Sequence, residues 1–239
     1  MVDNPEALAD AAAQWVHDRA WEVASARGRF TLALSGGNTP RALYTRLAAG
    51  PAPLGADGDL LRGRAHRFRP TSPDSNYRMV KETLLRAPGL SRSGCTGSAA
   101  SCPRRGGPDY EQTLRKLFPA AATLPALRPD APRARDRTGT PPRSSTTRRR
   151  WRRSEAWVIA NWVEQLGRHR LSFTYPVLDA AAEVLFLVAG ADKEWALHEV
   201  LRAVPRCEDV PARGVRPPRA RVTFLVDRAA AAGLGQMSA

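Results

Sequence analysis

Apolar residues recur at helical spacing along the first part of the chain and then give way to a short apolar run. Between residues 5 and 27 they fall every three or four positions, which predicts an amphipathic helix. Phe30 to Leu34 is apolar except for Thr31, a pattern typical of a strand buried on both faces of a parallel sheet. A Gly-Gly turn and a second helix over residues 41–49 follow, so the chain opens with a strand–turn–helix unit.

The rest of the chain continues this alternation. The pattern predicts helices over residues 76–86, 110–117, 176–182 and 191–204, and strands over residues 155–162, 170–174 and 184–189. Residues 222–227 and an Ala-rich tail close the chain. Alternating strands and helices favour an α/β fold with a doubly wound, mostly parallel sheet flanked by helices. The 239 residues are enough for one such domain over residues 1–239.

Charge is distributed unevenly along this pattern. The formal net charge is +14, yet residues 1–49 and 154–200 carry charges of both signs. The excess arginine lies in two islands, near residues 62–69 and 128–153, which are rich in Arg, Pro, Ser and Thr and show no hydrophobic period. We therefore expect disrupted segments near residues 60–70 and 127–153, and irregular or disordered chain over 88–107 and 127–153.

Several classes of protein are disfavoured by what the sequence lacks. No apolar run reaches the length needed to cross a bilayer. Asp3 and Glu6 lie near the start, without a basic segment ahead of an apolar one, which predicts no signal peptide and a cytoplasmic protein. Cys95, Cys102 and Cys207 form no CxxC pair and no zinc spacing, so neither a metal site nor a disulfide framework is predicted.

The most informative segment chemically is SGGNTP, which begins at Ser35 and follows the first predicted strand. Gly36 and Gly37 would let the backbone approach an anion, and the next helix would add the positive end of its dipole. Ser35 and Thr39 could add hydroxyl donors. The same residues also suit a plain Gly-Gly turn, with Thr39 as helix N-cap and Pro40 at the first helical position. The spacing alone favours neither interpretation.

Residues 34–44 (LSGGNTPRALY) resemble the LSGGSTP-x-x-LY motif of 6-phosphogluconolactonases. Glucosamine-6-phosphate deaminases, their structural relatives, share a looser form of it. Further blocks resemble the lactonases in the family's order: residues 72–79 (SPDSNYRM), 157–163 (WVIANWV), 170–178 (RLSFTYPVL) and 186–193 (FLVAGADK). The set of blocks is specific, although none would be so singly.

This resemblance implies a Rossmann-like fold and hydrolysis of 6-phospho-D-glucono-1,5-lactone to 6-phosphogluconate, without a cofactor or metal. Its partner would be that small-molecule lactone, and the protein would be a monomer. In such proteins the SGG loop, the Arg of the R-x-T strand and the Lys after the G-A-D turn hold the sugar phosphate. Carried over, the phosphate-binding residues are Ser35, Gly36, Gly37, Asn38, Thr39, Arg170 and Lys193. Without the resemblance, Arg170 would be a solvated strand end and Lys193 a surface lysine.

The catalytic motifs of the family are absent from the chain. The family carries G-D-E-R and G-x-G-x-D-G-H-x-A-S-L-F-P-G, and the His of the second motif is its general base. The Arg-rich islands stand where these motifs belong. Gly139 and Thr140 occupy the place of the His, so no catalytic residue is assigned.

Back-translation of the islands recovers the missing motifs. Codons that encode residues 136–145 can spell Pro-Asp-Gly-His-Thr-Ala-Ser-Leu-Phe when translation starts two bases later. Codons for residues 127–134 can spell Phe-Asp-Leu-Met-Leu-Leu-Gly one base later, and those for residues 60–66 can spell Phe-Phe-Gly-Asp-Glu-Arg. We therefore predict internal frameshifts, which also explain the basic charge, because GC-rich codons out of frame yield Arg, Pro, Ala and Gly.

Two consequences and two alternatives follow. The chain as written is predicted to be inactive and marginally stable, because prolines and unpaired arginines would replace a central strand. The first alternative is a basic nucleic-acid-binding protein that uses residues 148–153, with Trp151 for stacking. The second is a related sugar-phosphate isomerase or deaminase. The lack of a nucleic-acid module disfavours the first, and residues 72–79 and 157–163 disfavour the second.

Overall fold

The computed structural model describes twelve stretches of the chain, and the structural statements below concern only these. They are residues 1–28, 30–50, 58–62, 64–66, 75–86, 95–96, 103–118, 126–128, 156–163, 168–201, 210–218 and 221–234. The greater part of the predicted disruption at 127–153 therefore lies outside the described residues.

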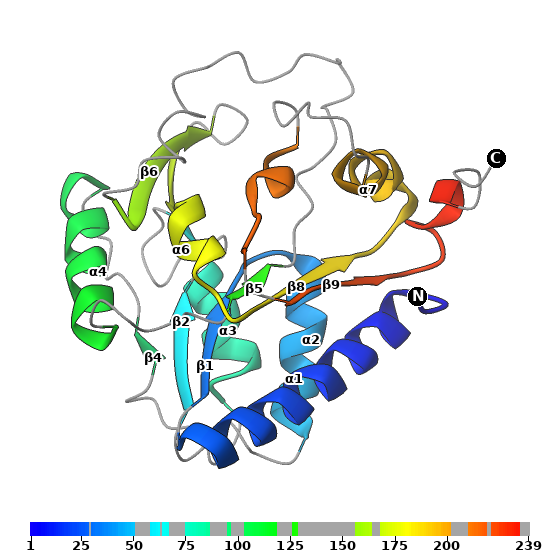
Figure 1. Ribbon diagram of the computed structural model, residues 1–239, viewed down its shortest axis with the longest axis horizontal. Coiled ribbons are helices and arrows are strands. Elements are labelled where there is room, and N and C mark those ends of the chain that lie inside the picture. Colours follow the sequence, from blue (N-terminus) through cyan, green and yellow to red (C-terminus); the bar gives the residue numbers. More distant parts are fainter. Residues whose placement is uncertain are drawn as a thin grey trace.

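Six strands form the main sheet, in the order β4-β2-β1-β5-β8-β9, and every pairing in it is parallel (Figure 1). In chain order they are β1 (Phe30–Leu34), β2 (Gly58–Arg62), β4 (Cys95–Thr96), β5 (Ala126–Arg128), β8 (Glu183–Val188) and β9 (Arg221–Val226). The predicted α/β fold with a mostly parallel sheet is thus confirmed. Parallel strands require crossovers, and helices supply most of them.

Helices cover the sheet on both faces. The first group is α1 (Pro5–Arg27), α2 (Asn38–Ala49) and α3 (Asn76–Thr83); the second is α4 (Pro103–Leu117), α6 (Tyr175–Asp179) and α7 (Glu194–Leu201). Strand β8 shows how the core divides between them: Leu185 and Leu187 pack with the first group, and Phe186 and Val188 with the second. Alternating side chains point to opposite faces, so a wholly apolar strand serves two cores.

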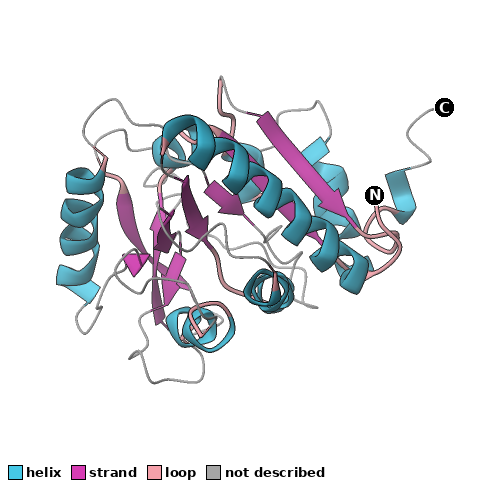
Figure 2. Ribbon diagram, turned by 90° about the horizontal axis from the view of Figure 1, so that it is seen from below, coloured by secondary structure: helices cyan, strands magenta, loops and turns pink. Residues whose placement is uncertain are grey.

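The long helix α1 owes its limits to local signals. Asn4 is its N-cap, and the side-chain oxygen of Asn4 accepts a hydrogen bond from the N–H of Ala7 at 2.8 Å. At the other end Gly28 has a φ of 70°, and its N–H donates to the carbonyl of Ala24 at 2.7 Å. Its apolar stripe packs against β1 and β9, and Figure 2 shows α1 lying across the strands.

A second, smaller sheet differs from the expectation of one parallel sheet. It contains β3 (Arg64–His66), β6 (Val158–Val163) and β7 (Arg168–Phe173) in the order β3-β7-β6, and both pairings are antiparallel. Only residues 164–167 connect β6 to β7. A parallel crossover needs a dozen residues or more, so this short connection requires antiparallel pairing.

The structure describes parts of the segments that were expected to be disrupted. Residues 58–62 and 64–66 form β2 and β3, and β2 pairs with β1 along its whole length. Within residues 88–107, Cys95–Thr96 forms β4 and α4 begins at Pro103. Residues 126–128 form β5, which lies between β1 and β8, while residues 129–134 lie outside the described part of the chain. Strand ladders use backbone groups that any non-proline residue supplies, and apolar character is therefore no requirement for pairing.

Strand β5 is nevertheless short. It has three residues, whereas its neighbours β1 and β8 have five and six. It ends at Arg128, directly before Pro129 in the sequence. Proline has no N–H to donate to a ladder, so the sequence itself limits how far this strand can pair.

No helix in the described stretches is long and apolar enough to cross a membrane. Within the same stretches, no group of three or more His, Cys, Asp or Glu side chains is arranged to hold a metal ion.

The imidazole of His17 gives the fold a predicted sensitivity to acid. His17 lies on α1 beside Gly50, and neither ring nitrogen has a hydrogen-bond partner among the described residues. Burial lowers the pKa of His17 below its ordinary value, and the nearby Asp18 opposes this only in part. The unfolded chain then binds more protons, so stability falls as the pH drops through about 6.5. We expect His17→Leu to reduce this loss in denaturation curves between about pH 7.5 and 5; an unchanged pH dependence would contradict the assignment.

Candidate functional site

The turn that follows β1 is fixed by a tyrosine from the next helix. The N–H of Ser35 donates to the Tyr44 hydroxyl at 2.9 Å, and that hydroxyl donates to the Ser35 carbonyl at 2.9 Å. The side chain of Tyr44 is fully buried. The Ser35 backbone is therefore held in place, while the buried Ser35 Oγ has no hydrogen-bond partner among the described residues. A buried hydroxyl in that state is costly, which suits a position that awaits a ligand.

Gly36 lies against the side chain of Asn76. A Cβ at position 36 would overlap the side-chain atoms of Asn76, the first residue of α3. Ser75 caps that helix, its Oγ accepting from the N–H of Arg78 at 3.4 Å. The structure thus gives Gly36 a packing role that the sequence interpretation, with backbone approaching an anion, did not include.

This close approach predicts the effect of a single methyl group. Gly36→Ala should lower the melting temperature, because the Asn76 side chain, the turn or the start of α3 has to move. Gly28→Ala is the matched control, since position 28 has a φ of 70° but nothing within 4 Å of the added Cβ. Backbone strain there costs about 1 kcal/mol. Thermal unfolding of both variants should show the larger loss for Gly36→Ala; an equal or smaller loss would mean that the overlap with Asn76 is relieved at little cost.

Helix α2 begins directly after Gly37, which has a φ of 122° and serves as its N-cap. Because that conformation is rare for residues with a Cβ, glycine is needed here. The alternative with Thr39 as N-cap is wrong, since the helix already includes Asn38 and Thr39. No side chain makes a capping hydrogen bond at this end. The N-terminus of α2 therefore keeps N–H groups available for an anion beside Ser35.

A second turn, after β8, carries Lys193. Gly190 has a φ of 92° and precedes the short helix η3 (Ala191–Lys193). The N–H of Lys193 donates to the Gly190 carbonyl at 3.0 Å. The Lys193 ammonium forms an ion pair with the carboxylate of Asp192, which is largely exposed. The Lys193 ammonium is thus held near this turn by Asp192, an exposed partner that solvent can readily replace.

The structure places the backbone of Arg170 in the second sheet. Arg170 lies in β7, opposite Asn161 of β6 and His66 of β3. Its side chain lies outside the described part of the chain. The predicted pairing of Arg170 with Lys193 around a phosphate therefore stays a prediction.

The two turns lie at the same edge of the main sheet. Strands β1 and β8 both pair with β5 in parallel, with Ala33 level with Ala126 and Ala126 level with Val184. The turns therefore both follow carboxyl ends. The strands that carry them are about 10 Å apart, and Gly190 lies four residues further along the strand direction than Ser35. The strand order also reverses between β1 and β5, since β2 and β4 extend one way and β5, β8 and β9 the other. Open α/β sheets bind ligands at such a point.

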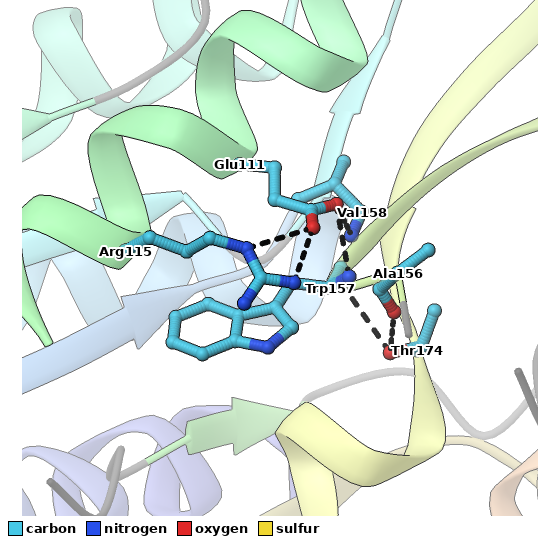
Figure 3. Close-up of polar contacts among 6 residues, drawn as sticks. All are labelled: Glu111, Arg115, Ala156, Trp157, Val158 and Thr174. Carbon is cyan, nitrogen blue, oxygen red and sulfur yellow. Dashed lines mark hydrogen bonds and ion pairs between the residues drawn. The ribbon is translucent and has the colours of Figure 1, made fainter. Parts of the chain in front are cut away.

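A polar cluster fastens the chain where it enters β6 (Figure 3). One carboxylate oxygen of Glu111, on α4, accepts from the N–H groups of Trp157 and Val158 at 2.9 and 3.2 Å. The other accepts from Arg115, whose guanidinium lies 4.6 Å from the centre of the Trp157 ring. The hydroxyl of Thr174, fully buried, donates to the Ala156 carbonyl at 2.7 Å. Residues 156–158 are thus tied both to α4 and to the end of β7.

Comparison with known proteins decides the family. The sequence pattern of the family described as glucosamine-6-phosphate isomerases/6-phosphogluconolactonase matches residues 3–130 and 142–224. The chain belongs to this family. A 6-phosphogluconolactonase of Nostoc is 32% identical over 213 residues, which cover 87% of this chain and 86% of the relative. One of Synechocystis is 29% identical over 241 residues, covering 97% and 95% of the two chains.

Solved structures of the family share the fold. The 6-phosphogluconolactonase of Trypanosoma brucei has a TM-score of 0.81 at 20% identity, with 98% of this chain and 97% of that chain covered. A monomeric glucosamine-6-phosphate deaminase has a TM-score of 0.73 at 18% identity, with 96% and 97% covered. Both activities of the family therefore occur on this architecture, and the architecture alone does not choose between them.

Some residues of this site were missed by sequence reasoning. Tyr44 is part of the quoted family motif, but its two hydrogen bonds to Ser35 become evident only in three dimensions. Asn76 opens a predicted helix, yet its contact with Gly36 joins segments 40 positions apart. Asp227 closes the last strand, and no pattern around it indicates a role. Only for Tyr44 was a signal present, because a helical residue ten positions after a strand end can turn back toward it.

Proposed function

We propose that this chain is a 6-phosphogluconolactonase whose sugar-phosphate site is kept and whose catalytic loop is displaced. Its intact form would hydrolyse 6-phospho-D-glucono-1,5-lactone to 6-phosphogluconate. The chain as written would bind the phosphorylated sugar and show negligible turnover. The observation that carries the proposal is that the Ser35 turn and the Lys193 turn follow the carboxyl ends of β1 and β8, the two strands that flank β5 beside the point where the strand order reverses.

The proposed phosphate site combines several kinds of donor. Ser35 would donate its unpartnered hydroxyl, and the α2 terminus over Gly37, Asn38 and Thr39 would donate backbone N–H groups. Lys193 would exchange its ion pair with Asp192 for one with the phosphate. Arg170 would complete the charge balance, since two cations match a phosphate dianion.

Lactone hydrolysis requires little more than a bound, oriented substrate and a general base. Water attacks the C1 carbonyl, the bond between C1 and the ring oxygen breaks, and a carboxylic acid and a C5 hydroxyl result. A histidine takes the proton from water and returns it to the leaving ring oxygen. In this proposal no metal or cofactor takes part. The curated relatives named 6-phosphogluconolactonase favour this reaction over deamination.

The place of residues 129–141 in the chain supports the proposal that the catalytic loop is displaced. Strand β5 ends at Arg128 next to the point where the strand order reverses, so the residues that follow it would reach the substrate. Residues 131–141 are the stretch left between the two matched parts of the family pattern. This stretch overlaps the codons that can spell Asp-Gly-His two bases later. We further propose that the intact protein is a cytoplasmic monomer and that neither nucleic acid nor a membrane is a partner.

Calorimetric titration of the full chain with 6-phosphogluconate tests this proposal. Gluconate, which lacks the phosphate, is the matched ligand control. We expect saturable binding of the phosphorylated sugar only, together with lactone hydrolysis no faster than the spontaneous rate. Equal binding of both sugars would refute the phosphate site. Hydrolysis well above the spontaneous rate would refute the displaced loop and leave the site intact.

A further inference from the structure

A buried carboxylate lies directly beneath the turn that carries Lys193. Asp227, at the end of β9, is 1% exposed. Its carboxylate accepts from two backbone N–H groups. The Gly190 N–H lies 3.1 Å from Oδ1 and 2.9 Å from Oδ2, and the Ala230 N–H lies 2.8 Å from Oδ1. The backbone N–H of Asp227 donates to the Val188 carbonyl at 3.0 Å. Asp227 thus binds both sides of the point where β8 ends.

These contacts define the course of the turn. Val188 is the last residue of β8, and Gly190 carries the positive φ that redirects the chain into η3. The Gly190 carbonyl then accepts the N–H of Lys193. A chain of hydrogen bonds therefore runs from the Asp227 carboxylate through Gly190 to the backbone of Lys193. The carboxylate is charged and shielded from water, so its bonds to N–H groups are strong and directional.

We propose that Asp227 is a positioning residue for the phosphate site, acting through Gly190 on Lys193. This inference rests on the proposed phosphate-binding role of Lys193. The Lys193 ammonium lies at the end of a long, flexible side chain, so its position depends on how firmly its backbone is held. Asp227 also joins the first residues to the site, because it lies level with Val2 in a parallel bridge.

The charge of Asp227, and not its shape alone, is needed for this role. Both carboxylate oxygens accept from Gly190, and Oδ1 accepts from Ala230 as well. An asparagine keeps one acceptor and turns the other into an N–H₂ donor that faces the Gly190 N–H. Asp227→Asn therefore preserves the side-chain volume but disfavours the hydrogen bonds that hold the turn at Gly190. For this reason it is a more specific probe than Asp227→Ala.

The test combines a binding measurement with a double-mutant cycle on the full chain. The variants are Asp227→Asn, Lys193→Met and the two together, titrated with 6-phosphogluconate. We expect Asp227→Asn to raise the dissociation constant about tenfold, because a displaced cation loses most of its contact. In the double variant the loss should not exceed that of Lys193→Met by itself. Thermal unfolding, measured in parallel, ensures that each variant is titrated below its melting temperature.

Asp179→Asn is the matched control. Asp179 ends α6, before β8 begins, and its carboxylate accepts the N–H of Arg216 at 2.6 Å. It therefore makes a similar contact at the opposite edge of the sheet. We expect a lower melting temperature and an unchanged dissociation constant for this variant.

The outcomes separate this inference from the proposed function. If the chain binds 6-phosphogluconate and Lys193→Met weakens binding, but Asp227→Asn changes only the melting temperature, Asp227 is purely structural and the inference fails alone. Losses that add in the double variant would also overturn it. If the unaltered chain does not bind, or if Lys193→Met has no effect, the Lys193 role fails and the inference fails with it.

Discussion

Lactone hydrolysis should appear when the displaced segments are restored. We expect a variant in which residues 60–66, 127–134 and 136–145 carry their shifted translations to hydrolyse 6-phospho-D-glucono-1,5-lactone about 10²–10⁴-fold faster than the unaltered chain, the range that a positioned general base contributes. The restored segment would also lengthen β5, which now ends at Arg128. Initial rates at fixed pH, with spontaneous hydrolysis subtracted, measure the gain.

The gain has two separable sources, folding and the new base. A second restored variant, with asparagine in place of the restored histidine, keeps the apolar strand and removes the base. We expect this control to fold as well as the first variant and to stay near the background rate. If both restored variants are equally active, the histidine is not the base. If neither exceeds the unaltered chain while both fold cooperatively, the frameshift hypothesis is wrong.

The second large effect concerns Lys193, the cation of the proposed phosphate site. Lys193→Met should raise the dissociation constant for 6-phosphogluconate by about ten- to hundredfold, because a hydrogen bond to a charged group contributes about 1.5–3 kcal/mol. Its side chain is 18% exposed, so solvent screens the interaction only partly. Binding of gluconate, which carries no phosphate, should not change.

Lys116→Met provides the control for a lost positive charge. Lys116 is an exposed residue in the last turn of α4. Its removal lowers the net charge by the same amount and should leave the dissociation constant unchanged at physiological salt. Equal weakening by both substitutions would show that overall charge, and not the turn after β8, attracts the ligand.

The β1 unit shows how far local sequence reaches. Phe30–Leu34 was predicted as a strand and is one, and α1 spans the residues that its periodicity predicts. The predicted starts of α2 and α4 lie three and seven residues too far along the chain, since α2 begins at Asn38 and α4 at Pro103. A helix start with weak apolar periodicity is set by caps and packing, which single-residue patterns do not contain.

The basic islands show a limit of composition. Arg-rich sequence near residues 60–70 was expected to be disrupted, yet Gly58–Arg62 and Arg64–His66 are strands. Pairing with β1 and β7 supplies backbone partners from distant parts of the chain. The antiparallel pairing of β6 with β7 was similarly unforeseen, although the four residues between them already required it.

The sequence by itself determined α1, β1 and the Gly-Gly turn, because these depend on neighbours within a few positions. It also carried the resemblance to a sugar-phosphate family, through short blocks that recur in the family's order. Tertiary structure alone decided that Tyr44 holds Ser35, that Asn76 packs on Gly36 and that Asp227 holds the turn of Lys193. Each of these contacts joins a side chain to the backbone of a segment distant in the sequence. Their energy depends on distance and burial, which are defined only once the sheet has brought the segments together.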